Sequence, residues 1–186
     1  MERDGDAPEA ERQLIRNAKL VLEVGSDDEV DDALEGARAV TASLDGYVSW
    51  EGPGAMTLRI PDVALEDALE RIGAYGEVER REIRSQDVTE SYTDLQIRLD
   101  NARALQARLR DLLERAETVS DVVEVENALS RVTLEVERLE GQKRLLDNQI
   151  VFSTVRFEVY DGATPGPLGW VVVGLYNTVK WLFVWE

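Results

Sequence analysis

The chain has 186 residues, which suits a single domain with an appendage, and 38 acidic against 21 basic side chains give it a net charge of −17. Because so acidic a chain repels phosphate backbones, we expect no nucleic-acid partner. The sequence contains no cysteine and no histidine, which excludes disulfides, thiol nucleophiles, Cys/His zinc sites and Ser-His-Asp triads. No nucleotide or metal motif stands out, so we expect no cofactor.

The N-terminal stretch lacks the pattern of a packed element. Residues 1–13 are polar, include Gly and Pro, and show no periodic apolar face, so we predict a flexible leader. They also lack the basic and apolar regions that define a signal peptide.

Residues 14–89, together with residues 150–160, carry the pattern of a small α/β head. Apolar positions alternate in the expected strands and recur every three or four residues in the expected helices. The predicted elements are a strand at 18–24, a helix from Ser26 or Asp27 to Asp45-Gly46, strands at 47–51 and 55–60 joined by Gly-Pro-Gly, a helix from Pro61-Asp62 to Gly73 or Gly76, and strands at 77–88 and 150–159. This order is that of a split βαβ unit. We therefore predict an α+β fold with a ferredoxin-like antiparallel sheet and both helices on one face.

Residues 90–149 form a separate unit in which the apolar period changes. Apolar and small residues recur at alternating spacings of three and four, which is typical of the a and d positions of a coiled coil. Thr118 and Ser120 are both good N-cap residues, so we expect one helix to end and a second to begin there. We predict an antiparallel coiled-coil hairpin inserted before the last strand. The predicted seam includes Leu95, Leu99, Leu105, Leu109, Leu112, Leu129, Val132, Val136, Leu139 and one charged position, Lys143.

The C-terminal segment differs from the rest of the chain. Residues 161–169 are a turn-rich linker, and residues 168–185 contain one charged residue, Lys180. We predict that residues 168–186 contact a membrane, because a helix this apolar on all sides has more surface than the small head can cover. The alternative is a C-terminal helix buried on the head or on a partner. The residues predicted to contact the membrane are Trp170, Trp181, Phe183 and Trp185.

A set of short motifs in a fixed order points to a family. They are Ser85-Gln86-Asp87-Val88-Thr89 followed by Tyr92, Asp94 and Leu95, and also Gly46-Tyr47-Val48, Leu58-Arg59-Ile60-Pro61, Gly76-Glu77-Val78, Thr118-Val119-Ser120-Asp121 and Ser153-Thr154-Val155. In these motifs the chain resembles the bacterial envelope family catalogued as domain of unknown function 4349. The resemblance implies a lipoprotein-like or membrane-anchored protein of the bacterial cell envelope, with the acidic leader following a lipid-bearing residue. It carries over no catalytic residue.

The family motif Asp87, Val88, Thr89, Tyr92 and Asp94 stands where the fourth strand passes into the first long helix. These residues can form a small polar site. They can also act structurally, with Thr89 or Asp87 accepting hydrogen bonds from the first free N–H groups of the helix and Tyr92 packing at the base of the hairpin. We favour the structural interpretation.

Two basic features are open to more than one interpretation. Lys143 either sets the register of the hairpin or faces a partner, or it lies near the hairpin base with its ammonium group reaching solvent. Arg80, Arg81 and Arg84 form a basic patch on the fourth strand. We expect them to pair with neighbouring acids rather than to bind a ligand carboxylate.

These patterns favour a non-enzymatic scaffold or protein-interaction module of the cell envelope. Its arm would bind an unknown protein or a second copy of the chain. The alternatives are an adaptor-like component of a transport assembly, by analogy of architecture alone, and a head domain that binds a small ligand. An enzyme that relies on carboxylates is the weakest alternative, because no pair of acids is marked by its surroundings.

Overall fold

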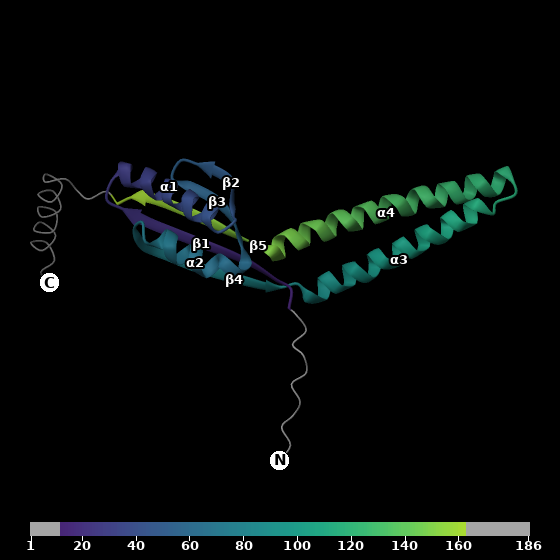
Figure 1. Ribbon diagram of the computed structural model, residues 1–186, viewed down its shortest axis with the longest axis horizontal. Helices are drawn as coiled ribbons and strands as arrows, with labels where there is room; N and C mark the ends of the chain where they lie inside the picture. The colour runs from purple at the N-terminus through teal and green to yellow at the C-terminus, as the bar shows by residue number, and fades with distance from the viewer. Residues whose placement is uncertain (1–11, 163–186) are drawn as a thin grey trace, which may run out of the picture.

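A computed structural model describes residues 12–162 and shows a head of sheet and helices from which two long helices project (Figure 1). Its elements are β1 (Leu14–Val24), α1 (Asp27–Ser43), β2 (Tyr47–Gly52), β3 (Ala55–Pro61), the 3-10 helix η1 (Asp62–Ala64), α2 (Leu65–Gly73), β4 (Glu77–Asp87), α3 (Thr89–Glu114), α4 (Val119–Val151) and β5 (Phe152–Asp161). The predicted α+β class is confirmed. Most of the predicted leader and the whole apolar C-terminal segment lie outside the described residues.

The head is built on a five-stranded sheet in the order β2-β3-β5-β1-β4. β1 pairs antiparallel with β4 and parallel with β5, so the sheet is mixed, and the prediction of an all-antiparallel sheet is wrong. The reason is topological. β4 ends beside the start of β1, and α3 and α4 run out and back, so they return the chain to that same end of the sheet. β5 therefore starts there, runs with β1, and lies between β1 and β3.

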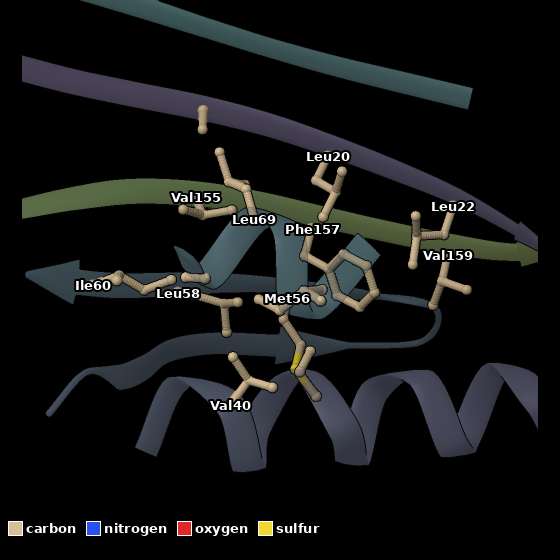
Figure 2. Packing of buried hydrophobic residues seen from close by; sticks show 14 of the residues in the cluster. Leu20, Leu22, Val40, Met56, Leu58, Ile60, Leu69, Val155, Phe157 and Val159 are labelled. Carbon is tan, nitrogen blue, oxygen red and sulfur yellow. The ribbon is translucent and has the colours of Figure 1, made fainter. Parts of the chain in front are cut away.

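The hydrophobic core lies between one face of the sheet and helices α1 and α2. Successive side chains of a strand point to opposite faces, and the buried positions of β3 and β5 alternate with exposed or partly exposed ones, as do those of β1 apart from the buried Val21. On α1, Ala33 and Ala37 are fully buried, so small side chains let this helix lie close to the sheet. The core side chains include Leu20, Leu22, Val40, Met56, Leu58, Ile60, Leu69, Val155, Phe157 and Val159 (Figure 2).

Local signals in the sequence explain where the elements begin and end. The Ser26 side chain caps α1 by accepting a hydrogen bond from the Glu29 N–H at 3.4 Å. Gly54, in the predicted turn between β2 and β3, has φ +64°, a conformation that favours glycine. β5 starts two residues later than predicted, because the Phe152 N–H still donates to the Asn148 carbonyl and α4 continues to Val151.

Candidate functional site: the helical arm and its base

Helices α3 and α4 form an arm that projects from one end of the sheet (Figure 1). α3 follows β4 directly and α4 passes directly into β5, so both ends of the arm are held by strands of the same sheet. At its far end the two helices are separated by residues 115–118, and the Thr118 hydroxyl caps α4 by accepting from the Asp121 N–H at 3.1 Å. The predicted helix break at this position is confirmed.

The start of α3 is tied to the start of β1 by the family motif. Asp87 Oδ1 accepts a hydrogen bond from the Thr89 N–H at 2.9 Å. Hydrogen bonding to the Thr89 side chain, followed by this bond to the backbone N–H, holds the pKa of Asp87 below its ordinary value. The Thr89 hydroxyl accepts from the Gln13 N–H at 2.9 Å, and the N–H of buried Val88 donates to the Gln13 carbonyl at 2.8 Å. These contacts fix the direction in which the arm leaves the sheet.

One turn further along, three polar side chains close a triangle of hydrogen bonds between the two helices. Lys143 Nζ donates to the Tyr92 hydroxyl at 2.7 Å, and that hydroxyl donates to Asp147 Oδ1 at 2.8 Å. Lys143 also donates to Asp147, at 2.9 Å from Oδ2. The ammonium group lies 4.9 Å from the centre of the Tyr92 ring, close enough for a cation–π contact. The motif tyrosine therefore joins α3 to α4.

The triangle shifts the pKa values of two of its members. The hydrogen bond to Tyr92, followed by that to Asp147, raises the pKa of Lys143. Partial burial acts to raise the pKa of Asp147, but the hydrogen bonds from Lys143 and Tyr92 together outweigh it, so this pKa lies below its ordinary value. Both groups are thus held in their charged forms, which suits a structural role better than proton transfer.

Asp94, the last member of the predicted motif, does not join the triangle. It is exposed, and its nearest partner is Arg98 one turn along α3, at 3.9 Å. The arrangement places Asp87, Thr89 and Tyr92 in structural contacts and leaves Asp94 on the surface. Within residues 12–162, no group of three acidic side chains is arranged to hold a metal ion.

The half of the arm next to the head has a buried seam. Leu95, Leu99, Val136 and Leu139 form a hydrophobic cluster with exposed fractions of 7% or less, and the partly buried Val132 packs against it. Ion pairs flank the seam, with Arg103 at 2.8 Å from Glu140 and Arg98 at 3.7 Å from Glu135.

Part of the predicted seam on α3 is wrong. Leu105 and Leu112 are 47% and 53% exposed, whereas Gln106 is buried and donates to the Thr133 hydroxyl at 2.9 Å. The physical reason is the regular alternation of spacings of four and three residues along a seam. Starting from Leu95 and Leu99, this alternation reaches positions 106 and 113, and it passes over 105 and 112. The apolar character of Leu105 favours it as the seam residue, but the spacing alone identifies its polar neighbour Gln106.

The outer half of the arm has no buried residue. From residue 107 to residue 132 every side chain is exposed or half-buried, including the predicted seam residues Leu109 and Leu129. Two helices alone cannot enclose their own seam there. Leu105 and Leu112, seven residues apart and therefore on one face of α3, add an exposed apolar flank.

The residues predicted to contact a membrane, Trp170, Trp181, Phe183 and Trp185, all lie outside the described residues. Within residues 12–162, none of the helices combines the length and the apolar character that crossing a bilayer requires.

The predicted family is confirmed by comparison with known families. The sequence matches the family described as "Domain of unknown function (DUF4349)" over residues 12–185, which covers the head, the arm and the C-terminal segment. Searches of curated proteins and of solved structures give no match. The chain therefore belongs to the DUF4349 family.

Proposed function

We propose that this protein is a non-enzymatic scaffold of the bacterial cell envelope, which associates with a second copy of itself through the outer half of its arm. The observation that carries the proposal is the flank of Leu105 and Leu112, two half-exposed leucines beside a seam that its own two helices leave open. Exposed apolar rows of this kind are typical of helices that pack against further helices.

The charges of the outer arm favour a second copy over an unrelated partner. Arg108, Arg110 and Arg115 lie near the end of α3, and Asp121, Glu124 and Glu126 lie in the first two turns of α4. None of these six side chains forms an ion pair within the described residues. In a two-fold pair of arms, α3 of one copy meets α4 of the other, so the three arginines of each α3, which have Asp111 and Glu114 among them, lie near the three acids of the other α4. The product would be a four-helix bundle.

The finer description of the fold belongs to the same proposal. The spacing of Leu95, Leu99, Val136 and Leu139 supports treating the arm as an antiparallel coiled coil. When β5 is set aside, the remaining order β2-β3-β1-β4 is that of a split βαβ sheet, which supports a ferredoxin-like head extended by one strand.

Self-association is tested by sedimentation velocity of the full chain in a mild detergent. We expect the native protein to dimerise, and the double variant Leu105→Gln with Leu112→Gln to be monomeric. The matched control is Ile97→Gln with Leu145→Gln, which changes two equally exposed apolar residues near the base of the arm. A native monomer at about 100 μM, or equal loss of the dimer in both double variants, would contradict the proposal.

The envelope part of the proposal rests on the apolar C-terminal sequence and on the family resemblance. Residues 168–186 would anchor the protein to a membrane, with Trp170, Trp181 and Trp185 at headgroup depth. Liposome flotation of the full chain beside a chain that ends at Thr164 tests this directly. We expect only the full chain to float. If neither floats and the shortened chain unfolds, the C-terminal segment belongs to the core and the membrane role is wrong.

A further inference from the structure

The face of the sheet opposite α1 and α2 carries polar residues in a regular grid. The pairing register places Asn17 between Thr154 and Arg84, and Lys19 between Arg156 and Glu82. Asn17 and Lys19 alternate with the core residues Ala18 and Leu20, so they point to the face away from the core. No described helix packs over these positions. The six side chains line a hollow of about 280 Å³ that spans three adjacent strands.

The charge of this hollow is opposite to that of the molecule. Lys19, Arg84 and Arg156 are cationic, and Glu82 is the one acid that lines it, in a chain of net charge −17. The local surplus of positive charge attracts a compact anion, while the acidic remainder of the surface repels an extended polyanion. The hollow thus favours anions over cations, and small anions over extended ones.

Two of the three cations are already paired. Lys19 Nζ lies 2.8 Å from Glu158, and Arg84 Nε lies 2.6 Å from Glu82. Arg156 is exposed, and its guanidinium forms no hydrogen bond and no ion pair with any residue from 12 to 162. Its fork of N–H donors is therefore free to bind a carboxylate or phosphate with two parallel hydrogen bonds.

An aromatic surface adjoins Arg156. A second hollow of about 380 Å³ is lined by Trp50, Thr57, Glu158 and Arg156 itself, so the two hollows share the free guanidinium. Trp50 is 57% exposed, and its indole lies against Gly52, where a Cβ would come within 2.5 Å of the ring. Gly52 thus leaves the space that the indole occupies. A large aromatic ring held at the surface is suited to packing against the ring of a ligand.

We propose that this face of the sheet binds a small carboxylate that carries a ring. Its carboxylate would pair with Arg156 and its ring would pack on Trp50. Asn17 would supply a further hydrogen bond, and so would the O–H of Thr154, whose oxygen already accepts from Arg59 at 2.7 Å. The ring is that of a sugar acid or of an aromatic acid, because either can place its carboxylate on Arg156 and its ring on Trp50. The site is separate from the arm, and it does not depend on self-association or on membrane contact.

The test is an NMR titration of the full chain in detergent, which follows the indole N–H of Trp50 after its assignment with Trp50→Phe. Glucuronate and benzoate are the ring-bearing probes and distinguish the two ring types. Glucose carries the ring without the charge, and acetate and inorganic phosphate carry charge without the ring. We expect glucuronate or benzoate to saturate the shift with a Kd of about 1 mM or tighter, and the other three to bind at least about tenfold more weakly.

Two substitutions separate a built site from general attraction of anions. Arg156→Gln should weaken binding of the saturating probe about tenfold or more. Arg80→Gln is the matched control, since Arg80 is an exposed arginine without an ion pair in residues 12–162 that does not line the hollow, and it should leave the Kd unchanged. Absence of saturation by both ring-bearing probes, binding of acetate as tight as theirs, or equal weakening by the two substitutions would each overturn the proposal.

Discussion

The head and the arm use their apolar residues in opposite ways. In the head, alternate residues of the central strands are enclosed between sheet and helices, and side chains such as Phe157 and Leu58 are fully buried. In the arm, burial is confined to a few residues near the base, and none of the residues from 107 to 132 is buried. The head is thus complete in itself, whereas the outer arm exposes apolar surface that a second pair of helices would cover.

The comparison shows that the buried residues that stabilise the fold and the exposed residues suited to binding lie in different regions of the chain. The sheet encloses a core because residues far apart in the chain, on β1, β3 and β5, meet on one face. The arm is long and contacts little besides itself, so its stability decreases with distance from the head. The substitutions below test whether the two regions behave as separate units, in order of decreasing effect.

The largest effect is expected for Phe157→Ala in the head. This ring is fully buried at the centre of the core (Figure 2), so its removal leaves a cavity and should lower the free energy of unfolding by about 3–5 kcal/mol. Urea unfolding followed by circular dichroism measures the loss. Phe157→Leu is the control and should lose much less. A loss below about 1 kcal/mol for Phe157→Ala would mean that the core of the head is not tightly packed around Phe157.

A smaller and local effect is expected for Leu99→Ala in the arm. Leu99 is 1% exposed, but its neighbours lie on two helices only, and the site can relax around the cavity. We expect a loss of about 2–3 kcal/mol, seen as faster hydrogen exchange of α3 amides with little change in β1. Ile97→Ala, which shortens a half-exposed side chain of the same helix outside the proposed dimer contact, should change exchange rates hardly at all. Equal loss of protection in β1 would show that head and arm unfold together.

Local patterns in the sequence were enough to predict most elements. The alternation at 18–24, the Gly-Pro-Gly turn and the N-cap candidates are all signals within a few residues. The turn is found as predicted, Ser26 and Thr118 are each the one of two candidates that caps its helix, and the strand starts at Leu14, four residues earlier than predicted. The place of β5 could not be predicted in this way, because which strand it pairs with depends on where the arm returns the chain. The periodicity of apolar residues predicts that a segment is a strand, but it does not predict which strand pairs with it.

The same limit applies to the base of the arm. Tyr92 and Lys143 are 51 residues apart in sequence, so no local pattern links the motif tyrosine to the charged seam position. The buried Gln106 is a different case. Its position follows from the spacing of Leu95 and Leu99, and a prediction that gives apolar character more weight than period misses it.

A modest effect is expected for Tyr92→Phe. The change removes the hydroxyl that accepts from Lys143 and donates to Asp147, and leaves the direct contact between those two residues. Because the site is partly exposed, we expect a loss of about 1 kcal/mol, confined to amides at the base of the arm. Tyr47→Phe is the control, since no hydrogen bond holds the Tyr47 hydroxyl within residues 12–162. Equal effects of the two changes would mean that the hydrogen bonds of the Tyr92 hydroxyl do not stabilise the base of the arm.

The smallest effects are expected from pH, and they distinguish the two regions again. Folding lowers the pKa of Asp87 and Asp147, so their contribution to the arm is present above the ordinary value near 3.8 and is lost as pH falls through the folded pKa. Folding raises the pKa of Lys143 above 10.5, so its contribution is present below that value and is lost as pH rises through the folded pKa. Hydrogen exchange at the base of the arm should therefore be independent of these groups between about pH 5 and pH 10.

In the head, Tyr160 has a raised pKa in the alkaline range. Its hydroxyl donates to Glu79 at 2.7 Å, and this hydrogen bond raises its pKa from 10.0 to about 12. Its contribution is present below pH 10 and is lost as pH rises towards 12. Ultraviolet titration should show one tyrosine ionising at about pH 12, absent in Tyr160→Phe and shifted towards 10.0 in Glu79→Gln. If Glu79→Gln leaves the titration unchanged, the hydrogen bond to Glu79 is not the cause of the raised pKa of Tyr160.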